Sequence, residues 1–333
     1  MPFPILPWAE ISNNYRRGTI LLGNGASIAI APTFAYGSLL THARENELLD
    51  GDVQRLFDFF ETSDFELVLR LVWQASNVNR SLEIPDERTH QAYVRVRDSL
   101  IQAVRSVHPE YEQVTQHLPN MYQYLKGFDT VLSLNYDLLV YWTMAHGFNV
   151  DDGHKFKDCF RDGSFDDDWR RFRSLYGERE NTLVFYPHGS LALSRNNVEE
   201  EFKIHAAGHG LLEAILRQWR SERVVPLFVS EGTAGQKINS IRSSYYLSTV
   251  YREVLTSPRR SLTLFGWGLG EHDRHLLKRM RGSGIQRVAV SVFRGSQAYC
   301  NTAHQIIQDD LGEVEVDFFD SESPGCWIHP ADE

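Results

Sequence analysis

The strongest constraint on the fold is a set of seven short, nearly unbroken apolar runs spread along the 333-residue chain. They occupy residues 19–23, 130–134, 183–186, 224–229, 262–265, 288–293 and 314–319. Short runs without polar alternation are typical of parallel strands buried on both faces. Helical stretches separate the runs, so the sequence predicts an α/β fold with a doubly wound, mostly parallel sheet.

A long helical segment separates the first two predicted strands. Apolar residues recur there at helical spacing, for example at Phe65, Val68, Leu69 and Val72. A single crossover helix is enough to join two parallel strands, so the excess predicts a helical insertion over residues 40–128. We expect residues 1–333 to form one α/β domain that carries this insertion.

Composition argues against several classes of function. Lys and Arg number 34 and Asp and Glu 44, a net charge of −10, so the whole chain has no driving force toward nucleic acid or anionic lipid. The 3 cysteines form no CxxC pair, which favours a reducing compartment and argues against a disulfide framework or a four-cysteine zinc site. No apolar run approaches membrane-spanning length. We expect a cytoplasmic protein without direct nucleic-acid or membrane partners.

The first candidate site follows the first predicted strand, at Gly23-Asn24-Gly25-Ala26-Ser27. Small residues in such a turn let backbone amides approach the phosphates of a ligand. The alternative is a plain tight turn, because Ile28 stands where a full GxGxxG pattern has its third glycine.

The second candidate site is Leu134-Asn135-Tyr136-Asp137, at the carboxyl end of the second predicted strand, residues 130–134. Open α/β sheets bind ligands at these ends, where Asn and Asp side chains can bind ribose hydroxyls. In the alternative interpretation Asp137 caps the next helix and Asn135 satisfies a turn.

Two further strand ends carry polar or glycine-rich segments. His188 and Gly189 follow the run at 183–186, where the histidine is either catalytic or structural. The segment Gly266-Trp267-Gly268-Leu269-Gly270 follows the run at 262–265, and its glycines would let backbone pass close to a ribose or phosphate. His272 and His275 lack a third ligand nearby, so we predict no metal site.

Taken together, these four segments resemble the sirtuin superfamily, in particular its bacterial zinc-free branch, the sirtuin-like NAD hydrolases of antiphage defence. That branch has a Gly-x-Gly-x-Ser turn, a Thr-Asn-Tyr-Asp strand end, a catalytic histidine before glycine and a late Gly-Tyr-Ser-Leu-x-Asp segment. The resemblance covers residues 19–295 and implies a Rossmann-like fold without a zinc ribbon. This chain departs from the pattern with Asn24 for alanine, Leu134 for threonine and Trp267-Gly268 for Tyr-Ser.

The resemblance implies an NAD+ hydrolase that cleaves the nicotinamide–ribose bond to give nicotinamide and ADP-ribose. NAD would be the substrate, with no prosthetic group. His188 and Asn135 would serve the nucleophile and the ribose, and Asp137 the nicotinamide side or the developing cation. The residues implied to bind the pyrophosphate are Gly23, Asn24, Gly25, Ala26 and Ser27, and those on the adenosine ribose side are Gly266, Trp267 and Leu269.

The resemblance also implies NAD depletion in antiphage defence, a homo-oligomer, and a separately encoded sensor or HerA-type ATPase subunit, since this chain has no P-loop. Two other functions remain open. One is a group-transfer enzyme, an ADP-ribosyltransferase or deacylase, although the zinc-ribbon cysteines of a deacylase are absent. The other is a regulator that binds NAD or ADP-ribose without turning it over.

Overall fold

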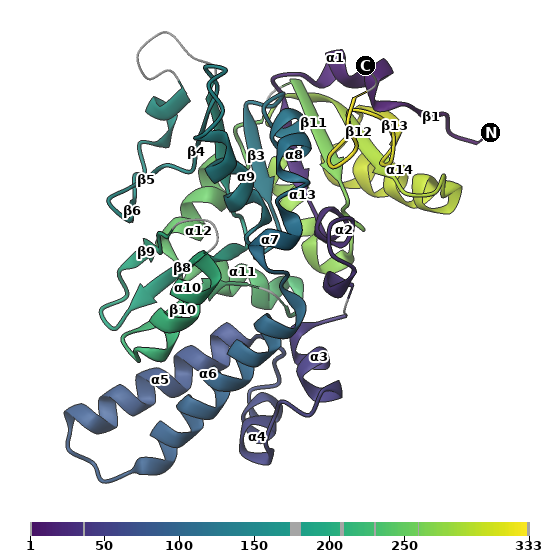
Figure 1. Cartoon of the computed structure of the whole chain (residues 1–333). Coiled ribbons are helices and arrows are strands. Elements are labelled where there is room, and N and C mark those ends of the chain that lie inside the picture. Colours follow the sequence, from purple (N-terminus) through teal and green to yellow (C-terminus); the bar gives the residue numbers. More distant parts are fainter. Residues whose placement is uncertain are drawn as a thin grey trace.

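The computed structural model describes residues 2–35, 37–173, 181–206, 210–229, 231–258 and 260–331. Its centre is a sheet built from β1 (Ile5–Leu6), β2 (Thr19–Leu22), β3 (Thr130–Ser133), β4 (Lys155–Lys157), β7 (Asn181–Phe185), β11 (Arg260–Phe265), β12 (Ile285–Val292) and β13 (Glu315–Asp320). These 8 strands lie in the order β1-β13-β12-β11-β2-β3-β7-β4, and every neighbouring pair is parallel (Figure 1). The predicted α/β fold is confirmed.

A second, smaller sheet is antiparallel. It consists of β5 (Phe160–Arg161), β6 (Ser164–Phe165), β8 (Gly189–Asn196), β9 (Glu201–Lys203) and β10 (Val224–Phe228), in the order β10-β8-β9-β6-β5. The prediction that residues 224–229 belong to the parallel sheet is therefore wrong. All five residues of β10 are buried, so it has the same continuous apolar pattern as a central parallel strand.

The predicted helical insertion is confirmed between β2 and β3. Its helices are α3 (Leu39–Glu45), α4 (Gly51–Phe59), α5 (Phe65–Ser81), α6 (Glu87–Val107), α7 (Tyr111–Val114) and α8 (Leu118–Leu125), preceded by the short α2 (Asn24–Ile28) and the 3₁₀ turn η1 (Pro32–Phe34). The hairpin of α5 and α6 extends away from the parallel sheet at the lower end of Figure 1. Helix α5 packs against β10, which joins the insertion to the small sheet.

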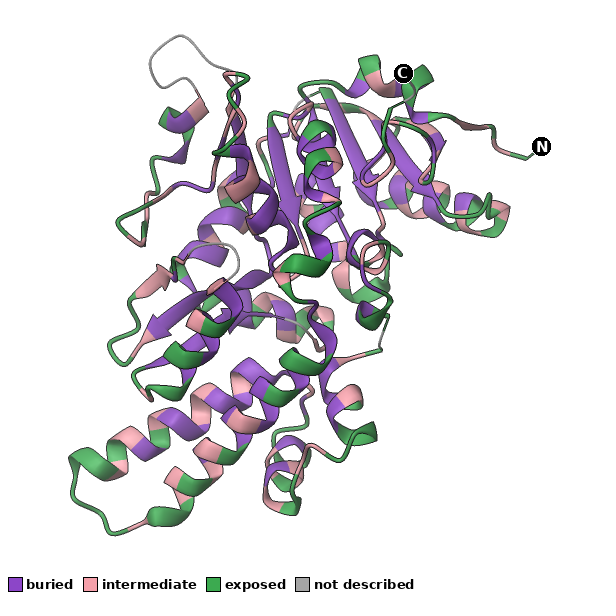
Figure 2. Ribbon diagram, in the orientation of Figure 1, coloured by how far each residue is buried: buried purple, intermediate pink, exposed green. Residues whose placement is uncertain are grey.

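The remaining helices cover the sheets. They are α1 (Trp8–Tyr15), α9 (Leu139–Gly147), α10 (Leu211–Arg220), α11 (Ala234–Arg242), α12 (Tyr245–Thr249), α13 (Arg274–Met280) and α14 (Gln297–Leu311), with the short helical turns η2 (Trp169–Arg173), η4 (Val250–Val254) and η5 (Glu271–Asp273). The central strands are buried along most of their length, while the helices expose their outer faces (Figure 2). Among the described helices, none is both long and apolar enough to span a membrane.

Candidate functional site

A pocket of about 1100 Å³ opens where the parallel strands end. Because every strand of the large sheet runs in the same direction, the segments that follow them meet at this edge. The lining includes residues that follow β2, β3, β7, β11, β12 and β13, among them Gly23, Asn135, His188, Gly266, Phe293 and Glu322. The structure thus brings the four segments singled out in the sequence to one cavity.

The glycine turns after β2 and β11 pack backbone against backbone. The Gly25 N–H donates to the Gly266 carbonyl at 2.7 Å, and the Gly23 N–H donates to the Phe265 carbonyl at 2.9 Å. Gly266 has a φ of +65°, and a Cβ there would lie 2.3 Å from the Ala26 nitrogen. A Cβ at Gly25 would lie 2.7 Å from the Gly266 oxygen. Glycine is therefore required at these positions for the two turns to meet.

Asn135 and Asp137 are joined through Ser27. The Asn135 Nδ2 donates to the Gly23 carbonyl at 3.0 Å and to the Ser27 Oγ at 2.7 Å. The Ser27 hydroxyl in turn donates to the Asp137 carboxylate at 2.5 Å, and the Leu139 N–H donates to its other oxygen at 2.9 Å. The network fixes the loop after β3 to the turn after β2, and Asp137 also satisfies the first amide of α9.

Asp137 is buried, with 4% of its surface exposed. Burial raises the pKa of Asp137 to about 6, although the hydrogen bonds from Ser27 and Leu139 oppose the shift. Asp137 therefore lines the pocket while its carboxylate links the turn after β2 to the start of α9.

His188 lies on the pocket wall between β7 and β8, with 3% of its surface exposed. Its Nε2 finds no hydrogen-bond partner among the described residues and faces the Asp273 carboxylate at 3.9 Å. Burial lowers the pKa of His188 to about 3, so the imidazole is neutral at physiological pH. A neutral histidine has one ring nitrogen with a lone pair that can accept a proton.

Sequence reasoning did not assign a site role to Lys237 or Asp273, yet both line the pocket. The Lys237 Nζ lies 2.7 Å from the Asp273 carboxylate, and the Lys237 side chain is only 7% exposed. The sequence patterns that could have indicated them are, for Lys237, a lysine early in a helix that follows a buried strand and, for Asp273, an acidic residue after the glycine-rich segment. Neither pattern distinguishes these residues from ordinary helix-end charges.

The predicted cofactor-binding residues divide into two groups. Lining the pocket are Gly23, Asn24, Gly25, Gly266 and Trp267, whereas Ala26, Ser27 and Leu269 are buried and lie outside its lining. Trp267 has a buried indole N–H without a partner in the described ranges, and its carbonyl accepts a hydrogen bond from the Tyr299 hydroxyl. Ser27 thus acts on the site through Asn135 and Asp137.

Two further pocket residues, Glu231 and Trp327, went unnoticed in the sequence, and Tyr136 was singled out only as part of the Leu134–Asp137 segment. The Tyr136 ring stacks on Phe228 at 5.1 Å and presents a buried hydroxyl, and Glu231 accepts a hydrogen bond from the Leu39 amide at the start of α3. Burial raises the pKa of Glu231 to about 7. Trp327, near the C-terminus, donates its indole N–H to the Ala26 carbonyl at 2.8 Å and supports the first turn from below.

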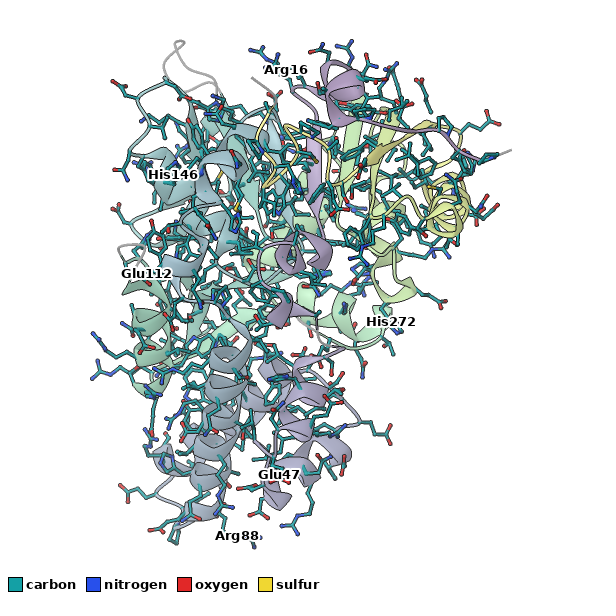
Figure 3. All side chains as sticks on the ribbon, turned by 45° about the vertical axis from the view of Figure 1, so that its right-hand side comes forward. Arg16, Glu47, Arg88, Glu112, His146 and His272 are labelled. Atoms are coloured by element: carbon teal, nitrogen blue, oxygen red, sulfur yellow. The ribbon has the colours of Figure 1, made fainter. Side chains whose placement is uncertain are left out.

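The two histidines that follow the late glycine segment do not share a site. His272 lies at the outer surface, where its side chain is exposed, whereas His275 is buried and its Nδ1 contacts the His272 carbonyl at 3.0 Å (Figure 3). Over the residues that the structure describes, no group of three or more His, Cys, Asp or Glu side chains could hold a metal ion.

Comparison with known proteins gives a family but no activity. No curated protein matches the chain. The sequence matches a domain of unknown function, DUF4917, over residues 20–327, a range that contains the whole parallel sheet except β1 and one residue of β2, and every predicted site residue. The protein belongs to the DUF4917 family.

Proposed function

We propose that this protein is an NAD+ hydrolase that releases nicotinamide and leaves ADP-ribose. The observation that carries the proposal is His188: a buried, neutral imidazole on the wall of a large pocket at the carboxyl ends of parallel strands. The sirtuin-like order of Gly23–Ser27, Asn135, His188 and Gly266 along the chain supports the same conclusion.

The chemistry asks little acid catalysis of the protein. Nicotinamide is a cationic leaving group, so the C1′–N bond breaks with its electron pair going to the pyridine ring, and positive charge develops on the ribose carbon. A water oxygen forms the new bond to C1′ and loses a proton. His188 would take that proton, because its ring is uncharged at physiological pH.

The glycine turns would hold the dinucleotide. Gly23, Asn24 and Gly25 line the cavity, so the pyrophosphate would lie against this turn. The Gly23 and Gly25 amides already donate to backbone carbonyls, which leaves the Asn24 amide as the main phosphate donor of the proposal. Asp137 is linked to Asn135 through Ser27, and its ionised carboxylate would stabilise the positive charge that develops on the ribose. Burial raises the pKa of Asp137, so the carboxylate ionises at a higher pH than usual.

One observation favours a second function, a regulator that binds NAD or ADP-ribose without turnover. The Asn135 Nδ2 is engaged with Gly23 and Ser27, so the amide nitrogen serves the fold of the turn. In this alternative His188 orients the ligand and abstracts no proton.

The deciding experiment measures nicotinamide and ADP-ribose release from NAD by the purified protein. We expect His188→Ala to reduce release by about 100-fold or more, with His272→Ala, an exposed histidine, as the matched control. Thermal stabilisation by NAD without nicotinamide release in any variant would contradict the hydrolase and support the regulator. Radioactivity from labelled NAD transferred to protein would instead indicate an ADP-ribosyltransferase.

We further propose that the hydrolase depletes NAD during antiphage defence under the control of assembly or a partner subunit. Unregulated NAD hydrolysis would harm the host cell. Expression of the active protein should lower cellular NAD only when the trigger or partner is present, and His188→Ala should abolish that loss.

A further inference from the structure

An ion pair lies within the pocket wall, next to the proposed catalytic histidine. Lys237 comes from α11 and Asp273 closes the η5 turn, and their Nζ and Oδ1 atoms are 2.7 Å apart. A buried ammonium group is strongly unfavourable without a partner, so the carboxylate explains how Lys237 can be buried.

The same Asp273 oxygen also faces His188. The distance from Oδ1 to the His188 Nε2 is 3.9 Å, which is too long for a hydrogen bond but close for an electrostatic interaction. Lys237 and His188 therefore share one carboxylate oxygen. This arrangement differs from a surface ion pair, because Lys237 and the neutral His188 are both nearly inaccessible to solvent.

The groups that face His188 come from three elements. They are Asp273 on η5, Lys237 on α11 and His275 on α13, whose ring stacks on His188 with centroids 5.8 Å apart. Burial is the main cause of the lowered His188 pKa; Asp273 opposes it, while Lys237 and His275 add to it. For Asp273, burial alone would raise the pKa, but His188 and Lys237 together lower it, so the carboxylate is ionised.

Building on the proposed hydrolase, we propose that Asp273 is a positioning residue that fixes the His188 proton on Nε2, and that Lys237 weakens this action by competing for the carboxylate. With the proton on Nε2, the lone pair is on Nδ1, which then accepts the proton of the attacking water. Lys237 helps to keep Asp273 ionised and adds to the effect of burial, which keeps His188 neutral. The pair thereby shifts, in opposite directions, the pH range in which the buried histidine acts as a base.

The test is a pH profile of nicotinamide release for Asp273→Asn and Lys237→Met. The two substitutions should move the acidic limb of the kcat profile in opposite directions, each by about one pH unit or more: downward for Asp273→Asn and upward for Lys237→Met. Asp273→Asn should also lower kcat by about 10-fold or more with little change in KM. Glu271→Gln and Lys278→Met, exposed charges on η5 and α13, are the matched controls.

A second readout separates this inference from the proposed function. The His188 ring is titrated by NMR in the intact protein, with no substrate. Opposite shifts of the His188 titration in the two variants support the coupling, and a protein that shows them yet releases no nicotinamide overturns the hydrolase alone. Shifts in the same direction, or none, overturn the coupling. If either variant fails to fold, Asp273→Glu and Lys237→Arg are measured instead. Both retain the charge at their position and should keep the wild-type pH profile of nicotinamide release; a changed profile in both contradicts the proposal.

Discussion

His108 links the helical insertion to the site through two hydrogen bonds that define its protonation state. It follows the last residue of α6, and its Nδ1 lies 2.8 Å from the Pro109 carbonyl, while the Leu138 N–H donates to its Nε2 at 3.1 Å. An imidazole that donates from Nδ1 and accepts at Nε2 must be neutral. Burial accordingly lowers the pKa of His108 to about 4. The amide it holds lies next to Asp137.

Because the folded-state pKa of His108 lies below the unfolded value of 6.5, its contribution to stability is present above pH 6.5 and is lost as the pH falls toward 4. The loss approaches about 3 kcal/mol at the lower end of this range. We expect His108→Gln to reduce the slope of the unfolding free energy against pH between 4 and 6.5, measured by urea denaturation. An unchanged slope, equal to that of the exposed-site control His272→Gln, would contradict this assignment.

The late glycine segment offers a comparison of two residues in one loop. A Cβ at Gly266 would overlap the backbone of Gly25 and Ala26, and its positive φ adds strain, whereas a Cβ at Gly268 would meet no atom within 4 Å. Gly266→Ala should destabilise the protein by about 2 kcal/mol or more and weaken ligand binding, while Gly268→Ala should change stability by less than about 1 kcal/mol. Thermal denaturation of both variants tests this; equal melting temperatures would contradict the backbone contact.

At the scale of elements, helix α4 has one phenylalanine in the core, Phe57, and one exposed to solvent, Phe59. Phe57 is 1% exposed and contacts the Phe65 ring at a centroid distance of 4.8 Å, while Phe59 is 80% exposed. Residues i and i+2 of an α-helix lie on roughly opposite faces. Val53 and Phe57, four residues apart, are the buried residues of α4 and form the face that packs on the core.

Phe57→Ala should therefore lower the free energy of unfolding by about 3–5 kcal/mol, because it leaves a cavity between α4 and α5. Phe59→Ala should change it by no more than about 0.5 kcal/mol. Chemical denaturation gives both values in one series. A large loss for Phe59→Ala would mean that this face of α4 is covered by a second protein chain in solution.

Much of the site was predictable at this scale because parallel strands end at one edge. Gly23 and Asn135 follow adjacent strands, so their proximity follows from the strand order alone. Lys237 was not predictable as a site residue, since β10 belongs to the small antiparallel sheet and its place could not be derived from an apolar run. The hydrogen bonds of Asn135 were also unpredictable, because side-chain direction within a loop depends on tertiary packing.

At the scale of the whole molecule, the pocket depends on the last described segment of the chain. Ser321, Glu322, Trp327, Ile328 and His329 contribute to its lining. Trp327 is fully buried, contacts the Phe265 ring at a centroid distance of 5.7 Å and donates to the Ala26 carbonyl. The segment that follows β13 thus closes one wall of a cavity whose other walls come from segments spread along the chain, from the turn after β2 to the start of α14.

Trp219 and Trp327 are equally buried, so substituting each in turn distinguishes an effect on stability from an effect on ligand binding. Trp327→Ala and Trp219→Ala should each cost about 3–5 kcal/mol, because both side chains are fully buried. Only Trp327→Ala should also weaken nucleotide affinity at a temperature where both variants remain folded, since Trp219 lies on α10, outside the pocket lining. Isothermal titration with ADP-ribose measures the difference; equal affinities would show that the Trp327 wall does not contact ligand.

The pairing of β1 with β13 has a consequence for synthesis on the ribosome. Ile5 and Leu6 are translated before the other strands of the sheet but pair with Phe318 and Phe319, which are translated about three hundred residues later. Such distant pairing delays completion of the sheet, because loop closure must precede the contacts that reward it. The nascent polypeptide therefore carries an unfinished pocket until the segment after β13 is made, and a translation product that stops before residue 321 would lack the wall that Ser321, Glu322 and Trp327 contribute.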